Sequence, residues 1–195
     1  SPRRTPRPHQ LRLFWRQLVR FFYAVMHAQT DRDAVFHRMQ AEGLTACAMS
    51  SVPNPTLEQW QHITAPAQGV LLGCYATQAD CASQGTAAPA QLLACAMFSP
   101  RRGRVWEFDF TTFRLAAALA VPMARGGLGW AFENLDCAAV MGLCPAPNRH
   151  AWRLAERCGF RVLGRLPGAC LHARKKTWTD GVLVLCTPQS LAAVA

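Results

Sequence analysis

The sequence NRHAWRLAERCGF, residues 148–160, contains the start and stop signals of a short helix. Asn148 follows two prolines, and its side chain can accept a hydrogen bond from the backbone N–H groups of the next turn. Gly159 can adopt the left-handed conformation that ends a helix. Apolar side chains recur at helical spacing between them, at Ala151, Leu154, Ala155 and Cys158. Because apolar segments flank the stretch on both sides, it predicts a strand-helix-strand unit.

The composition indicates a globular protein with a sizeable core: 195 residues, of which 51% are hydrophobic and 16% charged. The apolar segment LAAALAVPMA is interrupted by a proline and followed by Arg125, so we expect no transmembrane segment. The N-terminal SPRRTPRPHQ precedes no apolar signal core, which argues against secretion. Nine cysteines without a C-x-x-C motif are typical of buried thiols in a reducing cytoplasm. The isolated pair Cys170 and His172 lacks the other ligands of a zinc site, and we expect no metal.

The net charge of +10 is concentrated in two segments. Residues 1–20 contain six Arg and no acid, and residues 161–176 contain three Arg and two Lys and no acid. The first segment could bind nucleic acid or an acidic membrane surface. We instead expect residues 1–9 to form a disordered basic arm, and residues 10–28 a helix whose aromatic face packs on one domain spanning 10–195. Nucleic-acid binding is not expected, since these Arg residues are not interleaved with aromatics in any known module.

The hydrophobic periodicity predicts an α/β order of elements. Helices are expected at 31–42 and 56–63, the second with a Thr-x-x-Gln capping box, and at about 112–135. Strands are expected at 69–77, 91–99 and 104–111 as an antiparallel meander, at 137–144, and at 180–187. Residues 78–90 are expected to form a long loop.

The pattern N-x-x-A-x-x-L-x-x-x-x-G-F, formed by Asn148, Ala151, Leu154, Gly159 and Phe160, resembles the C-terminal motif of the GNAT acetyltransferase superfamily. The resemblance extends over residues 69–187, and some phage-associated and uncharacterised GNAT-like proteins have a similar pattern. It implies an α/β (α+β) fold with a mixed, mostly antiparallel central sheet flanked by helices, here with an extra N-terminal helix. It also implies acetyl-CoA as a substrate and an amine of unknown identity as acceptor.

GNAT enzymes hold the pyrophosphate of acetyl-CoA on backbone N–H groups at the start of the long central helix, through an Arg/Gln-x-x-Gly-x-Gly/Ala loop. Two segments could take this place here. Arg114 lies at the better distance from Asn148, but Ala117 then replaces a loop glycine. The segment ARGGLG, 124–129, has the glycines but no Arg or Gln at its start. We prefer Arg114, with the amides of 113–119 facing the phosphates.

The resemblance also directs attention to the predicted strand 104–111. There the pantetheine arm would pair with the backbone of Phe108 to Phe110. Strand alternation places Glu107 and Asp109 on one face, and either could be the general base that deprotonates the amine. The alternative is that both carboxylates are solvated or salt-bridged. The Tyr that many family members use as general acid is replaced by Ala155.

Two functions therefore stay open. The first is an acetyl-CoA-dependent N-acetyltransferase in the cytoplasm. The second is a GNAT-fold protein without catalysis, serving as a binding or assembly module through its basic N-terminal helix. The missing loop glycines and the missing Tyr favour the second function, whereas the retained Asn148 favours the first.

Overall fold

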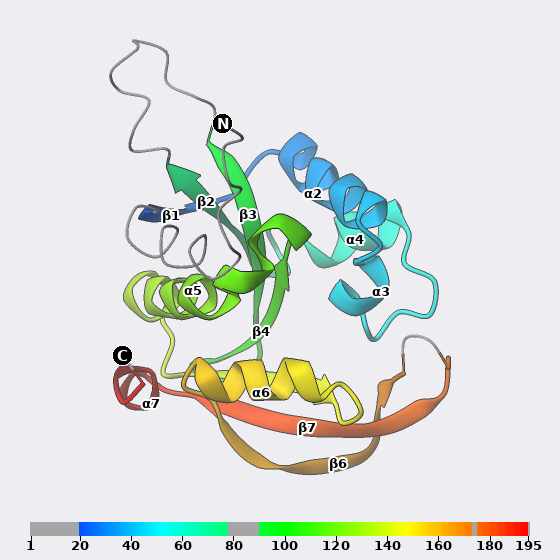
Figure 1. Cartoon of the computed structure of the whole chain (residues 1–195), viewed down its shortest axis with the longest axis vertical. Coiled ribbons are helices and arrows are strands. Elements are labelled where there is room, and N and C mark those ends of the chain that lie inside the picture. The colour runs from blue at the N-terminus through cyan, green and yellow to red at the C-terminus, as the bar shows by residue number, and fades with distance from the viewer. Residues whose placement is uncertain (1–19, 78–89, 173–174, 195) are drawn as a thin grey trace, which may run out of the picture.

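The computed structural model describes residues 20–77, 90–172 and 175–194, which form one seven-stranded sheet with helices on both faces (Figure 1). The strand order is β1-β2-β3-β4-β5-β7-β6. The strands are β1 (Arg20–Val25), β2 (Val70–Thr77), β3 (Gln91–Pro100), β4 (Val105–Thr112), β5 (Ala139–Pro145), β6 (Arg161–Leu171) and β7 (Trp178–Cys186). All neighbouring pairs are antiparallel except β4 and β5. The expected mixed, mostly antiparallel sheet is therefore confirmed.

The helices are α2 (Gln29–Ala41), α3 (Thr45–Ala48), α4 (Leu57–Ile63), the 3-10 helix η2 (Arg114–Leu119), α5 (Ala120–Asn134), α6 (Arg149–Arg157) and α7 (Pro188–Ala192). The predicted helices 31–42 and 56–63 correspond to α2 and α4. Thr56 and Gln59 form the predicted capping box at the start of α4. The predicted loop 78–90 lies, except for residue 90, outside the described residues.

Alternation along β3 builds the two layers of the core. Ala96 and Phe98 pack with α5 on one face of the sheet, whereas Cys95 and Met97 pack with α2 and α4 on the other. Figure 1 shows the same division, with α5 and α6 apart from α2, α3 and α4. β3 is thus buried from both sides, which explains its continuous apolar sequence.

The predicted N-terminal helix 10–28 is wrong where the structure describes it, because residues 20–25 form strand β1. β1 pairs with β2 along its whole length. Strand alternation puts Phe22 and Tyr23 on opposite faces: Phe22 stacks on Tyr75 at 5.0 Å between ring centroids, and the Tyr23 hydroxyl donates to the Met123 carbonyl at 2.9 Å. The spacing of apolar residues in this segment also suited a helix, but pairing with the edge of β2 made it a strand. Residues 1–19, including the expected arm 1–9, lie outside the described part.

The predicted helix 112–135 begins later and in a different form, as η2 followed by α5. The glycines of ARGGLG lie inside α5 and not in a loop. A Cβ at Gly126 would come within 2.0 Å of the Tyr23 hydroxyl, so this glycine allows β1 to pack against α5. The stretch Arg114–Asn134 is long and apolar enough to span a membrane. Met123, Ala124 and Leu128 within it are buried against the sheet, as in the core helix of a globular protein.

Candidate active site

Strands β4 and β5 separate after a short parallel pairing. They pair only from Val105 with Ala139 to Glu107 with Met141 among the described residues. Beyond this point β4 stays paired with β3, and β5 with β7. A cavity of about 560 Å³ fills the resulting gap, lined by residues 108–110 of β4 and 142–145 of β5.

The cavity reaches both faces of the sheet. On the α6 side its walls include Asn148, Ala151 and Leu154, and on the other side Cys47 and Ser50, from α3 and the turn after it. Since α6 and α3 cover opposite faces, two different molecules could enter the gap from opposite sides and meet between the strands.

The β4 edge that faces the gap is open to a ligand. Gly142 stands opposite it, and a Cβ on this glycine would lie 3.7 Å from the Phe108 carbonyl oxygen. Phe108 also stacks on Phe110 and Phe160, with ring centroids 5.8 and 5.9 Å apart. The aromatic side chains hold β4 in place while its backbone lines the cavity. This is the backbone of Phe108 to Phe110 that the sequence suggested for the pantetheine arm.

Asn148 caps α6, as the sequence predicted. Its side-chain oxygen accepts a hydrogen bond from the Ala151 amide at 3.3 Å. Gly159 ends the helix region at a φ of 97°, and a Cβ there would lie 2.9 Å from the Leu191 backbone of α7. The motif residues therefore position α6 along the cavity.

The two carboxylates predicted on β4 have different surroundings. Asp109 lines the cavity, with solvent access through it. The Asp109 side chain is exposed to the cavity, but the protein atoms packed around it disfavour its charged form and raise its pKa to about 6, against the opposing effect of Arg101. Glu107 is not among the lining residues and forms an ion pair with Arg101. For Glu107 the structure thus has the salt-bridged arrangement that the sequence left open, whereas Asp109 lines the cavity.

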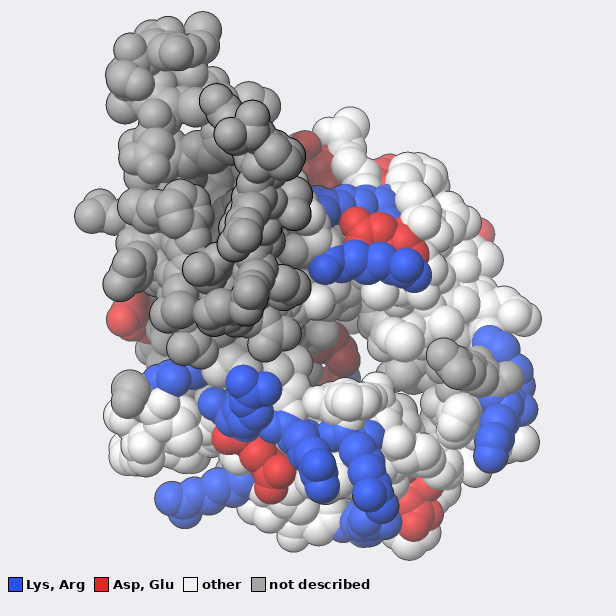
Figure 2. Space-filling model, viewed as in Figure 1, with Lys and Arg blue, Asp and Glu red and all other residues white. Residues whose placement is uncertain are grey.

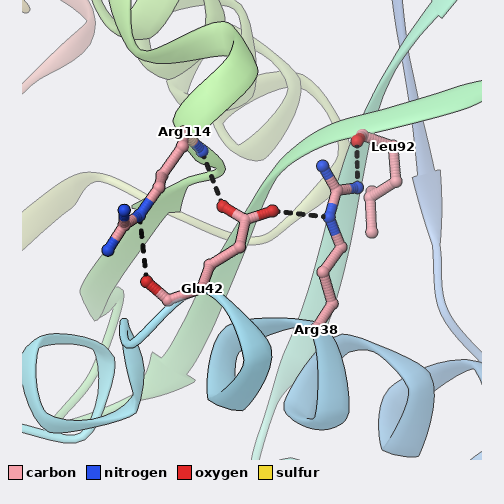
Figure 3. Close-up of polar contacts among 4 residues, drawn as sticks. All are labelled: Arg38, Glu42, Leu92 and Arg114. Carbon is pink, nitrogen blue, oxygen red and sulfur yellow. Dashed lines mark hydrogen bonds and ion pairs between the residues drawn. The ribbon is translucent and has the colours of Figure 1, made fainter.

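The N-terminus of η2 is occupied by a carboxylate from α2's C-terminal end (Figure 3). The Arg114 amide donates to Glu42 Oε2 at 2.7 Å, and Arg114 Nε donates to the Glu42 carbonyl at 3.0 Å. Arg38 Nε binds the other oxygen of Glu42 at 3.1 Å. Partial burial alone would raise the pKa of Glu42, but the bonds from the Arg114 amide and from Arg38 hold it below its ordinary value.

This arrangement bears on the predicted phosphate site. Neither Arg114 nor Ala117 lines the cavity, which reaches the central helix at Ala124, seven residues after Ala117. Burial raises the pKa of the Cys158 thiol to about 11, and the positive charges of Arg125 and Arg157 oppose this shift. Both guanidinium groups therefore lie near Cys158, which lines the cavity. Neither arginine lines the cavity itself, and Arg125 lies in the wall of a second cavity between α5 and α7.

Several lining residues were not assigned to the cavity from the sequence. Cys47 and Ser50 belong to the stretch 45–51, in which every residue except Met49 is small, and this could have indicated a close approach of backbone. His172, at the end of β6, is another. Cys144 also lines the gap, but burial, followed by the charge of Asp109, raises the pKa of its thiol to about 11. A thiol in this state is a poor nucleophile at neutral pH. Among the described residues no group of three or more His, Cys, Asp or Glu could hold a metal ion.

The chain matches no family model and no curated protein by sequence. Solved structures resemble it closely in fold. A spermidine N-acetyltransferase from Vibrio cholerae, in complex with CoA and spermine, has a TM-score of 0.66 at 12% identity over 88% of this chain and 98% of that one. A putative phosphinothricin N-acetyltransferase has a TM-score of 0.62 at 14% identity, over 86% and 98%. A GCN5-related N-acetyltransferase from Kribbella flavida has 0.60 at 19%, over 88% and 99%.

These likenesses confirm that the chain has the GNAT fold, as the residues around Asn148 indicated. At such identities the comparisons establish the fold alone.

Proposed function

We propose that this protein is an acetyl-CoA-dependent N-acetyltransferase that transfers the acetyl group directly to an amine. The observation that carries the proposal is the cavity between the separated strands β4 and β5, with Asp109 in its wall. Support comes from the solved N-acetyltransferases of the same fold, one of which contains CoA. The eight cysteines within the described residues are free thiols, which supports a reducing compartment such as the cytoplasm.

In the proposed reaction acetyl-CoA enters along α6, and its pantetheine arm bonds to the β4 backbone at Phe108 to Phe110. The amine enters from the α3 side and approaches Asp109. Ionised Asp109 takes a proton from the ammonium, directly or through water, and the free amine attacks the thioester carbonyl. A carbon–nitrogen bond forms and the carbon–sulfur bond breaks. The proton that the new amide nitrogen loses passes through water to the leaving thiolate, which departs as CoA, and Asp109 returns its proton to solvent. No covalent enzyme intermediate is needed.

The phosphates of acetyl-CoA have two candidate positions. The resemblance places them at the start of η2, with Arg114 and Ala117 near them and Asn148 supporting the adjacent helix. In that case Glu42 must release the Arg114 amide, because the Glu42 carboxylate already accepts the hydrogen bond that this amide would donate to a phosphate. The alternative is the pair Arg125 and Arg157, which lie near the cavity-lining Cys158 and form no ion pair among the described residues.

The binding or assembly module remains the second candidate, and Glu42 is the observation that favours it. An internal carboxylate on the helix start repels phosphate, as expected of a protein that no longer binds acetyl-CoA. The basic N-terminal helix assumed for this role is a strand at 20–25, so its contact surface would have to include residues outside the described part.

Calorimetry with acetyl-CoA and with free CoA, at low and at moderate salt, tests the proposal. We expect binding of both, weakening as salt increases because phosphates meet guanidinium groups. No heat and no thermal shift with millimolar acetyl-CoA would contradict the acetyltransferase function and leave the module as the remaining candidate.

A further inference from the structure

We infer that the acceptor amine carries an extended apolar body, such as an alkyl chain, which lies on an uncovered apolar surface of β5, β7 and β6. The inference rests on the proposed function, because this surface begins in the wall of the cavity where the amine would react. It concerns the side of the sheet that carries α2, α3 and α4, from which the acceptor would enter.

Asp109 and Leu143 point to the same side of the sheet. Asp109 is the register partner of Met97, which packs with α2 and α4. Gly142, next to Leu143, faces the other way, because a Cβ there would lie 3.2 Å from Val184 in the core on the α5 and α6 side. Strand alternation therefore directs Leu143 to the side of Asp109, and both residues line the cavity.

Apolar side chains continue on this side from β5 across β7 to β6. Register and alternation place there Met141 and Leu143 of β5, Leu183 and Leu185 of β7, and Leu166 of β6. We call these residues the apolar face. All are at least partly exposed, Leu166 to 42%, and none belongs to a hydrophobic core cluster of the described residues. Contiguous exposed apolar side chains of this kind mark a surface that binds something.

The apolar face is continuous from the cavity outward. Side chains of neighbouring strands approach each other over Gly181 of β7, where an added Cβ would lie 2.6 Å from Leu143 Cδ1 and 2.9 Å from Cys170 Sγ of β6. Adjacent strands lie about 4.8 Å apart, so roughly 10 Å separate β5 from β6, which an alkyl chain of about eight carbons spans. A chain attached to an amine at Asp109 can therefore lie along the apolar face.

The opposite side of the same strands is closed and cationic. Val182 and Val184 of β7 are buried there in the core that α5 and α6 cover. The exposed residues Arg149, Arg153 and Arg157 follow one another along α6 at four-residue intervals and so share one side of the helix. Figure 2 shows Lys and Arg side chains gathered over the part of the molecule where Figure 1 places α6. An apolar ligand therefore finds its surface only on the side of Asp109 and Leu143.

The apolar face offers no partner for a second charge on the acceptor. Asp109 is the only acid among the described residues that line the cavity, and in the proposed reaction it takes a proton from the amine. Charged side chains border the face at the end where β4 and β5 are paired, at Arg161 and at the ion pair of Glu107 with Arg101. A second ammonium on the face would leave water without an anionic partner, whereas each buried methylene group favours binding by about fourfold.

Propylamine, hexylamine and octylamine test the inference, together with aminopentanol and diaminopentane, which have the length of hexylamine but a polar end. Acetyl-CoA-dependent turnover is measured for each with the full chain. We expect kcat/KM to rise by about tenfold or more from propylamine to octylamine, and to fall by about tenfold from hexylamine to diaminopentane. Equal rates along the series, a preference for diaminopentane, or no turnover of octylamine by protein that binds acetyl-CoA would overturn the inference.

Two matched variants locate the effect. Leu166 and Val162 of β6 are similarly exposed, to 42% and 43%, but Val162 is the register partner of Val184 and lies on the α6 side. Leu166→Ser should lower the ratio of kcat/KM for octylamine to that for propylamine by about threefold or more, and Val162→Ser should keep this ratio. The ratio compares two substrates on one protein, so a loss of folded protein does not change it. A ratio that responds equally in both variants, or in neither, contradicts the inference.

A second copy of this chain is the other molecule that could cover the apolar face. Sedimentation velocity of the unmodified protein and of Leu166→Ser tests this, and we expect the substitution to leave the association state unchanged. A dimer that the substitution dissociates, together with equal rates for the three alkylamines, would make the face a subunit interface and overturn the inference. Protein that binds acetyl-CoA but acetylates these amines alike keeps the proposed function, whereas protein that binds no acetyl-CoA loses both.

Discussion

At the scale of single residues, neighbouring positions on one strand face have different chemistry. Glu107 and Asp109 are both carboxylates on β4, but Arg101 neutralises the first, and the cavity walls raise the pKa of the second to about 6. A carboxylate with a pKa near 6 is ionised at neutral pH and is a stronger base than an ordinary one. This difference leads to two predictions.

Asp109→Asn should reduce turnover by roughly 10²- to 10⁴-fold, the usual range for loss of a general base, with nearly unchanged acetyl-CoA affinity. The matched variant Glu107→Gln should retain most activity, since its carboxylate is outside the cavity. If the proposed function is right, the unmodified protein should lose kcat/KM below a pH of about 6, as Asp109 becomes protonated. Steady-state kinetics across pH measures all three. Full activity of Asp109→Asn at pH 7 would mean that the amine arrives already deprotonated.

Asp109→Asn should also raise the melting temperature at pH 8. An Asp titrates near 3.8 when unperturbed and near 6 in this fold, so between these values the native state holds a proton that the unfolded state has lost. Stability therefore falls as pH rises through this window and stays lower above it. Asn cannot ionise and avoids the loss. Thermal unfolding should show the gain at pH 8 and none near pH 3.5; a gain that is independent of pH would point to packing instead.

At the scale of elements, two contacts fix the central helix. At its start Glu42 caps η2, and further along Gly126 accommodates Tyr23 of β1. The first contact joins α2 to the candidate cofactor side, and the second joins the first strand to the core. Each can be disturbed by one substitution.

Gly126→Ala should destabilise the protein by about 1–3 kcal/mol, because the new Cβ overlaps the Tyr23 hydroxyl and breaks its bond to Met123. Gly129 lies in the same helix, and a Cβ added there would have no atom within 4 Å among the described residues. Gly129→Ala should therefore stabilise by roughly 0.5–1 kcal/mol. Chemical denaturation of both variants makes the comparison. If the two alanines have the same effect, β1 does not pack on α5 as described.

Cofactor binding should distinguish the two phosphate positions. If the phosphates lie at η2, Arg114→Ala weakens acetyl-CoA binding by about 1–3 kcal/mol, and Glu42→Gln strengthens it by removing the competing charge. If they lie between α5 and α6, Arg125→Ala with Arg157→Ala produces the loss and Glu42→Gln has little effect. Calorimetry of the three variants, with Arg165→Ala as a control on β6, separates these outcomes.

At the scale of the whole molecule, the sheet extends from β1 at one edge to β6 at the other, and the cavity lies where its two parts separate. The N-terminal strand belongs to the part that supports α5. The stability of that part should therefore depend on how much of the N-terminus is present.

Deletion of residues 1–9 should change the melting temperature by only a few degrees, whereas deletion of 1–28 should lower it by roughly 10 °C or more. The longer deletion removes β1, the partly buried Tyr23 and the buried Met26. Each buried side chain contributes about 1.5–3 kcal/mol, and the loss of a strand exposes the edge of β2. Differential scanning calorimetry measures both. An equally stable protein without residues 1–28 would contradict the role assigned to β1.

Local signals in the sequence were sufficient for many elements and for the fold. Asn148 and Gly159 bound α6 because capping depends on hydrogen bonds between near neighbours, and Thr56 with Gln59 begins α4 for the same reason. Alternation along 91–111 predicted β3 and β4, since strand faces follow the residue count. Together with the motif around Asn148, these signals identified the GNAT fold and placed Asp109 on a strand beside the acetyl site that the resemblance implies.

Tertiary structure alone decided what depends on the approach of distant segments. Residues 20–25 suit a helix or a strand by their spacing, and only the free edge of β2 selected the strand. Glu42 is 72 positions from Arg114, and no local pattern indicates that its carboxylate caps η2. The difference between Glu107 and Asp109 has the same origin, because an ion pair and a cavity wall depend on how the sheet curves and separates. Sequence spacing determines faces and caps, but the partner of each face is determined only when the chain packs.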